Sequence, residues 1–392
     1  MFRNLIDNLL SWFRKDDRFL VVEITPRGVR ATEALANFSE KIIRIFTPRN
    51  YQGLVDFKKR GKILENTKIV LSLSHEFATT VYETLFFARE NKKAEISEAE
   101  LDNVASSAVW KVFDKHRAAA AVKMSVGEAD VALSDINVWS MALDGRKVLN
   151  PLGFPGKKIE MLVSETMIPK EVVVALASVF PKELVVLITE SAMSFARVTR
   201  EAARQREQFL FSHVGDKITS LIMSRGGDIV HHDSFGWGTD DAAAGLAKEF
   251  LEDGKIADSV VASYNLKRGS QFFLQKAESI MEKEYKLFAH GMSRVFKELN
   301  GRLAYIYAPR VLPDFVFRIP LRNKSGRIVK IFPAGEKLIS DNFGFVVKYE
   351  VGVKEILGDN VLFHILDAHL APPASLADMI GKKRMRWLAR NK

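Results

Sequence analysis

At 392 residues the chain is long enough for two or three domains, and 47% apolar with 27% charged residues is typical of a folded protein. No apolar run reaches the roughly 20 residues of a membrane-spanning helix, and the absence of cysteine excludes disulfides and thiolate metal sites. The net charge of +10 favours anionic partners such as anionic lipid, an acidic protein or nucleic acid. Nucleic acid is not expected, because no zinc-knuckle spacing or RNA-binding signature accompanies the basic excess.

The first segment, MFRNLIDNLLSWFRKDDR, is amphipathic. Its apolar side chains fall within an arc of roughly 160° on a helix, and its charged residues exclude a secretory signal. Such a helix either packs against its own domain or lies in a membrane interface; Phe and Trp favour the interface. The predicted membrane-binding residues are Phe2, Leu5, Ile6, Leu9, Leu10, Trp12 and Phe13.

The next segments alternate between strand and helix patterns. FLVVEITPRGVRATEAL (19–35) predicts a hairpin, and KIVLSLS (68–74) predicts a strand. SEAELDNVASSAVWKVF (97–113) predicts a helix that begins with a capping box of Ser97 and Glu100. Residues 148–171 and 183–198 each predict a strand followed by a helix.

The second half begins with two or three strands over 209–238, with a hairpin at Gly226–Gly227. Residues 239–299 are helical in pattern, and the last 90 or so residues return to short strands. Pro372–Pro373 separate off a basic C-terminal helix, which predicts a second membrane contact. Its predicted membrane-binding residues are Lys382, Lys383, Arg384, Arg386 and Trp387. The alternation indicates an α/β protein with at least two lobes.

Three stretches, in order, resemble the actin-like ATPase superfamily: VVEITPRGVRATEA, NPLGFPGKKIEM, and the segment from HVGDKITS to TDDAAAGLA. The first and third are similar to the family's two phosphate loops. The second is similar to an element of the extra subdomain of the cell-division family FtsA. FtsA is therefore the nearest family by resemblance, and the pilus family PilM is the next, because Asp216 and Lys217 occupy a loop interior that is glycine-rich in FtsA.

The resemblance implies an α/β, actin-like two-lobed fold of ribonuclease H-like subdomains with an FtsA-type inserted α/β subdomain. The expected boundaries are an amphipathic N-terminal helix (1–17), the first lobe in two parts (18–74 and 166–200), the inserted subdomain (75–165), the second lobe (201–371) and a basic C-terminal helix (372–392).

The nucleotide site that the resemblance implies is degenerate. Its cofactor-binding positions are Glu23, Thr25, Gly215, Thr219 and Gly238. Pro26 has no N–H to donate to phosphate, and His213 stands where the family has an acid that orients Mg²⁺ and its water. Ser220 and the Ala308-Pro309-Arg310 segment depart from the family pattern too. We expect no catalytic residues, no metal site and no cofactor; bound ATP with Mg²⁺ remains the alternative.

Other polar clusters have simpler explanations. His231 and His232 are adjacent on a predicted strand and face opposite sides, which disfavours a shared metal. Asp240 and Asp241 are expected to cap the helix that follows them. Trp237 either packs in the core or closes over a vacated cleft.

The resemblance implies an FtsA-like, membrane-associated scaffold or adaptor of cell division or envelope assembly. It is expected to be a pseudo-ATPase that does not hydrolyse ATP, located in the cytoplasm on the inner face of the cell membrane. Its expected partners are anionic inner-membrane lipid and a division or envelope-assembly protein such as an FtsZ-like one, with self-association left open. An active actin-like ATPase and a PilM-like type IV pilus adaptor are the alternatives.

Overall fold

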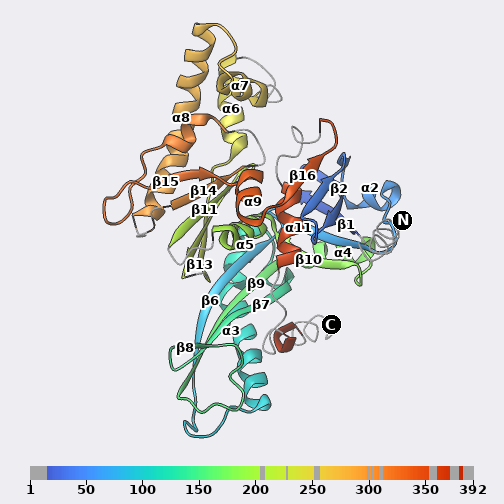
Figure 1. The fold of residues 1–392 in the computed structure, drawn as a ribbon, viewed down its shortest axis with the longest axis vertical. Helices are drawn as coiled ribbons and strands as arrows, with labels where there is room; N and C mark the ends of the chain where they lie inside the picture. The colour runs from blue at the N-terminus through green and yellow to red at the C-terminus, as the bar shows by residue number, and fades with distance from the viewer. Residues whose placement is uncertain are drawn as a thin grey trace, which may run out of the picture. The chain divides into compact units, whose positions relative to one another are not determined.

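The computed structural model describes residues 16–203, 208–226, 228–250, 257–297, 301, 303–308, 312–352, 360–370 and 379–382. These residues form two compact units (Figure 1). The first unit holds the described residues up to Ser194, 344–352 and those from Val361 onwards; the second holds Phe195–Phe343 and Asn360.

The first unit is built on a mixed sheet in the order β10-β5-β1-β2-β3-β16, with β4 paired to β2. The central strand β1 is apolar and buried along most of its length, because it has a neighbour on each side and core on both faces. The strands are β1 (Asp17–Thr25), β2 (Gly28–Asn37), β3 (Ile42–Ile45), β4 (Arg49–Tyr51), β5 (Thr67–Leu73), β10 (Val185–Glu190) and β16 (Val346–Tyr349). The helices around them are α2 (Leu54–Arg60), α4 (Lys170–Val179), the start of α5 (Ser191–Ala203) and α11 (Asn360–Leu370).

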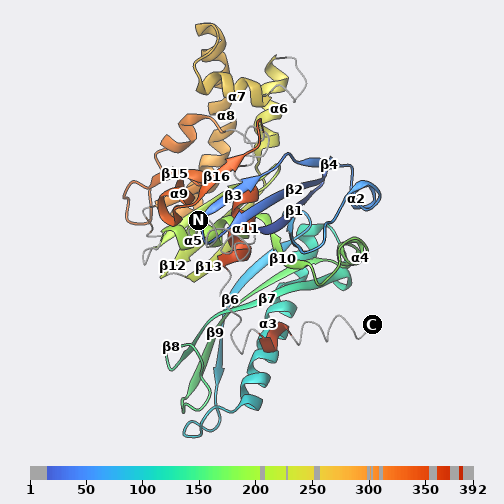
Figure 2. The ribbon, with the colours of Figure 1, turned by 45° about the vertical axis from the view of Figure 1, so that its right-hand side comes forward.

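An α/β subdomain is inserted between β5 and β10. Its antiparallel sheet has the order β6-β9-β7-β8, and α3 packs along one face of it through Leu101, Ala105, Val109 and their neighbours (Figure 2). The predicted helix runs on to Met124, because the Ala-rich segment 118–121 consists of strong helix formers. The elements are β6 (Thr79–Ala88), α3 (Glu98–Met124), the 3₁₀ turn η1 (Glu128–Asp130), β7 (Val131–Leu143), β8 (Arg146–Val148) and β9 (Lys158–Pro169).

The second unit has a five-stranded sheet in the order β13-β12-β11-β14-β15 and a core of aromatic and aliphatic side chains. The described residues of 239–297 are helical and contain no strand, as the sequence predicts. The strands are β11 (Phe209–Val214), β12 (Thr219–Arg225), β13 (Asp228–Phe235), β14 (Leu303–Tyr307) and β15 (Lys330–Pro333). The helices are α6 (Thr239–Phe250), α7 (Ala257–Asn265), α8 (Gln271–Phe296), the 3₁₀ turn η3 (Asp314–Arg318) and α9 (Glu336–Phe343).

The two sheets share one topology. β3-β2-β1-β5-β10 and β13-β12-β11-β14-β15 have the same strand order. In each, adjacent strands among the first three are antiparallel, and the last two run parallel to the central strand, β1 or β11. Two copies of this ribonuclease H-like order, with a subdomain inserted in the first, are the actin-like fold. The expected fold class is confirmed.

The expected lobe boundaries need correction. The second lobe does not extend to 371, because β16 pairs in parallel with β3 and most of α11 belongs to the first unit. The first lobe's second part ends at Ser194 rather than at 200. The inserted sheet begins at Thr79 and ends at Pro169.

Candidate functional site

The first phosphate-loop candidate is the turn between β1 and β2. Glu23 lies opposite Arg30 in the register of this hairpin. The Arg30 guanidinium donates to both carboxylate oxygens, with Nε to Oε2 at 2.7 Å and Nη2 to Oε1 at 2.9 Å. Glu23 is buried and Arg30 partly so, which strengthens a bidentate ion pair. The acid of the first loop is thus neutralised by an arginine of its own hairpin.

The N–H groups of this turn are poorly suited to phosphate. Pro26 has none, and the N–H of Arg27 donates to the Thr25 hydroxyl at 3.2 Å. Gly28 has φ 132°, and a Cβ there would lie 2.5 Å from the Tyr51 carbonyl oxygen. The glycine is therefore required by the close approach of Tyr51 to the turn.

Polar side chains also gather where β5 and β10 end, which the sequence analysis missed. The hydroxyls of Ser72 and Ser191 lie 2.7 Å apart. The fully buried Glu190 accepts the N–H of Thr80 at 2.7 Å, and Lys123 Nζ lies 3.6 Å from its other oxygen. The sequence feature that could have indicated this cluster is the buried strand β10, which ends at Glu190 directly before α5 begins at Ser191. Because Thr80 lies at the start of β6 and Lys123 in the last turn of α3, Glu190 fastens the inserted subdomain to the core sheet.

A second acidic group follows β5. His75 Nε2 lies 3.3 Å from Glu76 Oε1. Burial by itself raises the pKa of Glu76, but the hydrogen bond and charge of His75 outweigh it and hold that pKa at about 2. Glu76 therefore carries a negative charge at neutral pH.

The second phosphate-loop candidate, Gly215–Ile218, packs onto the start of α6. The carbonyl oxygens of Gly215 and Asp216 accept the N–H groups of Thr239 and Asp240 at 2.9 and 2.8 Å. A Cβ at Gly238 would collide with the carbonyl of Asp216, so this glycine permits the close packing.

Side chains complete this junction. The Thr219 hydroxyl donates to the Trp237 carbonyl at 2.8 Å. Asp241 accepts the N–H of Gly238 at 2.8 Å, which is the capping role expected for the acid pair. Gly215, Thr219 and Gly238 are thus brought together in the second unit, whereas Glu23 and Thr25 lie in the first.

His213 lies in an aromatic cluster. Its ring is 5.2 Å from the ring of Phe195 and 5.7 Å from that of Tyr307, and Phe195 stacks on Tyr307 at 3.9 Å. His213, which stands where the actin-like superfamily has an acid, is therefore buried against aromatic rings. Ser220, the last departure in this loop, is directly opposite His213 on β12 and is fully buried.

These residues do not fit Mg²⁺ and nucleotide phosphates. Mg²⁺ prefers oxygen ligands, but Glu23 is held by Arg30 and the second loop offers His213 in place of an acid. In the first turn the Arg27 N–H already donates to the Thr25 hydroxyl, so it is not directed at a phosphate. No mechanism through a bound nucleotide follows from this donor set.

The remaining clusters have structural roles. Trp237 is buried in the core of the second unit against Tyr285 and Phe288, so it packs rather than closes a cleft. His231 and His232 alternate along β13. Within the described ranges no group of His, Asp and Glu is arranged to hold a metal. Pro309 and Arg310 of the third departure lie outside the described residues; Ala308 packs on the core.

The predicted membrane segments are mostly outside the structural description. Phe2 to Phe13 lie there, as do Lys383, Arg384, Arg386 and Trp387. Lys382 ends a short helical turn, 379–382, whose Ile380 packs on the core of the inserted subdomain. Across the part of the chain that the structure describes, no helix has the length and apolarity to cross a bilayer.

No family model and no curated protein matches the chain. Solved structures do. A PilM–PilN type IV pilus biogenesis complex matches at 14% identity and TM-score 0.48, covering 95% of this chain and 99% of that one. The cytoplasmic domain of EpsL, an inner-membrane component of the type II secretion system of Vibrio cholerae, matches at 9% and 0.39, covering 92% and 98%. A Bacteroides thetaiotaomicron protein with an actin-like ATPase fold matches at 8% and 0.36, covering 91% and 98%. The strand order, rather than these similarities, identifies the fold.

Proposed function

We propose that this protein is an actin-fold scaffold or adaptor of cell division or envelope assembly that does not hydrolyse ATP. The observation that carries the proposal is the Glu23–Arg30 ion pair. It puts a fixed cation in the hairpin where the superfamily places an acid for the metal. The guanidinium balances the charge of this acid without a metal ion, so the hairpin can stay folded without bound Mg²⁺ and nucleotide, and the fold can serve as a binding scaffold.

The order of the three motif-like stretches supports an FtsA-like role, and the NPLGFPG element in the inserted subdomain is the strongest of them. The Asp216–Lys217 turn favours the second candidate, a PilM-like pilus adaptor, because it lacks the glycines of an FtsA phosphate loop. The genes that neighbour this one distinguish the two: division genes favour the first role and pilus genes the second.

The test is phosphate release by the purified full chain with Mg²⁺ and ATP. We expect no rate above that of buffer. Gly215→Trp is the matched variant, because a bulky side chain in the second turn would block a phosphate. Turnover by the wild type that disappears in Gly215→Trp would show that the cleft tolerates these substitutions and that the chain is an active ATPase.

Membrane association is the second part of the proposal. The amphipathic segment 2–13 and the basic C-terminal segment together supply two weak anchors, and paired anchors hold a peripheral protein more firmly than one. The site of action would be the inner face of the cell membrane, beside an envelope-assembly partner.

A further inference from the structure

The far end of the inserted subdomain exposes large apolar side chains. We call residues 90–97 and 144–157 the distal tip; the second range includes β8 and the loop that follows it (Figure 1). Leu149 is 97% exposed and Phe154 56% exposed, both in the loop that leads from β8 to β9. A leucine that is nearly fully exposed is covered by no neighbouring side chain of the described residues, so this apolar surface is open to a partner.

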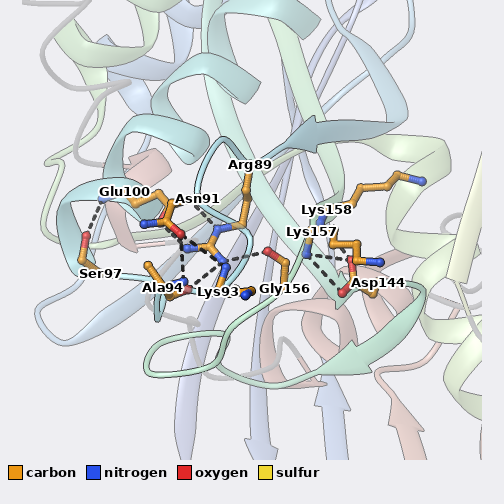
Figure 3. A network of polar contacts seen from close by, with 10 residues as sticks. All are labelled: Arg89, Asn91, Lys93, Ala94, Ser97, Glu100, Asp144, Gly156, Lys157 and Lys158. Carbon is orange, nitrogen blue, oxygen red and sulfur yellow. Dashed lines mark hydrogen bonds and ion pairs between the residues drawn. The ribbon is translucent and has the colours of Figure 1, made fainter.

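The tip is nevertheless held firmly. The buried Arg89 guanidinium donates from Nη1 to the carbonyls of Ala94 and Gly156 at 3.0 and 2.8 Å (Figure 3). Its Nε and Nη2 donate to the Glu100 carboxylate at 2.6 and 2.8 Å. One side chain thus ties together both loops of the tip and the first turn of α3.

Backbone bonds reinforce the same junction. The Ile96 N–H donates to the Phe154 carbonyl, and the Gly153 N–H donates to the Ile96 carbonyl, each at 3.1 Å. Asp144 accepts the N–H groups of Lys157 and Lys158 at 3.0 and 2.9 Å. Phe154 therefore sits on an ordered loop, and a partner that covers it does not have to order the loop first.

The charge around these side chains is mainly basic. The exposed acids of the tip are Glu90, Glu95 and Asp144, and the Asp144 carboxylate is already occupied by backbone N–H groups. The exposed basic residues of the tip are Lys92, Lys93, Arg146, Lys147 and Lys157.

We propose that the distal tip is a contact surface for an anionic lipid bilayer, with Leu149 and Phe154 inserted among the headgroups and the basic residues facing lipid phosphates. An exposed apolar pair with basic residues in the same loops fits an anionic bilayer, because the apolar side chains can enter it while the cations face the phosphates. Each basic residue near such a surface strengthens binding by about fivefold. The inference adds a third, structured contact to the two anchors of the proposed membrane association and rests on that proposal.

The direct test uses the absence of cysteine from the chain. The full-length Leu149→Cys variant is labelled with an environment-sensitive fluorophore and mixed with phosphatidylglycerol-containing vesicles. We expect a blue shift and quenching by brominated lipid, and neither effect with pure phosphatidylcholine. Val122→Cys is the matched control, because Val122 is 81% exposed on α3, outside the tip.

A second measurement gives the strength of the contact. Leu149→Glu with Phe154→Glu should weaken vesicle binding by about tenfold or more, and Val122→Glu should not. Leu149, Phe154 and Val122 are all exposed, so the melting temperature should stay unchanged in the double variant and in Val122→Glu.

The outcomes separate this inference from the proposed function. If the protein binds vesicles while the label at position 149 stays silent and the double variant binds normally, the tip inference is wrong and the membrane association stands. Adding Leu9→Glu removes the N-terminal anchor. A label response that survives it supports the tip alone, and loss of all binding in that variant overturns the tip as a contact in its own right.

Discussion

Glu165 is a carboxylic acid in a fully buried, unfavourable environment. It lies on β9 between Val81 and Ile136, fully buried on the face that packs against α3. Neither of its carboxyl oxygens has a hydrogen-bond partner in the described part of the chain. Burial, with a smaller contribution from the charge of Glu83, raises the pKa of Glu165 to about 9. The side chain is therefore neutral at physiological pH.

This pKa makes stability fall as pH rises. The folded state keeps the Glu165 proton up to about pH 9, whereas the unfolded chain releases it near the ordinary glutamate pKa of 4.5. Between those values the folded state binds the extra proton, so the free energy of unfolding decreases by up to about 1.4 kcal/mol per pH unit. Glu165→Gln should remove that slope in urea denaturation between pH 6 and 8.5. Glu160→Gln, a more exposed site on the same strand, should keep it; an unchanged slope in Glu165→Gln would contradict the assignment.

Two residue-scale features mark the limit of sequence reasoning. The Glu23–Arg30 pair was within reach, because a two-residue turn at Pro26–Arg27 fixes which residues face each other. The capping box was only half right. Ser97 accepts the N–H of Glu100 at 3.2 Å, but the Glu100 carboxylate binds Arg89 instead of returning to Ser97. The buried Arg89 guanidinium, 11 residues earlier in the chain, binds the Glu100 carboxylate in place of the Ser97 backbone. The local sequence around Ser97 contains no pattern that predicts this contact.

At the scale of elements, Arg89 decides whether two loops stay together. Arg89→Met should lower the free energy of unfolding by about 3 kcal/mol, because it removes the donor to the carbonyls of Ala94 and Gly156 and the ion-pair partner of Glu100. Amide exchange at Ile96 and Gly153 should quicken, since the bonds that these N–H groups donate to the carbonyls of Phe154 and Ile96 depend on that junction.

Matched variants test whether the effect belongs to the junction. Lys93→Met removes an exposed charge from the same loop and should change stability by less than about 0.5 kcal/mol. Arg89→Lys keeps the charge without the fork geometry and should recover only part of the loss. Equal stability of Arg89→Met and Lys93→Met would rule out the role given to Arg89.

The predicted N-terminal helix, residues 2–13, is also open to test. Leu9→Glu puts a charge in the middle of its apolar face and should weaken binding to anionic vesicles by about tenfold without abolishing it, because the other proposed contacts remain, while the melting temperature hardly changes. Asn8→Glu adds the same charge on the polar face and should keep most of the binding. A drop of many degrees in the melting temperature of Leu9→Glu would instead place this helix in the protein core.

Hairpins and helices with strong local patterns were predictable, such as β1–β2, β12–β13 and α3. The distal tip was not, because exposure at Leu149 depends on what fails to cover it. Periodicity reports which face of an element is apolar; it does not report which faces remain uncovered after folding.

At the scale of the whole molecule, the sequence predicted the class of fold and the number of lobes but placed their limits wrongly. The second lobe was assigned as one continuous stretch to residue 371, whereas the chain returns from the second unit to the first to add β16 beside β3 and then α11. Four-residue strands carry little periodic signal, and pairing between remote strands leaves none in a single sequence.

The pairing of β16 with β3 also determines how long β3 remains unpaired while the chain is being synthesised. The Thr47 N–H donates to the Glu350 carboxylate at 2.8 Å across 303 residues of chain. A ribosome that adds about 5–20 residues per second makes the second of these residues about 15–60 s after the first. Throughout that interval the nascent chain carries β3 as a bare edge of apolar Ile-Ile-Arg-Ile. The strand that ends its exposure arrives only when most of the second unit has already been made, so this edge is where a chaperone would be needed during translation.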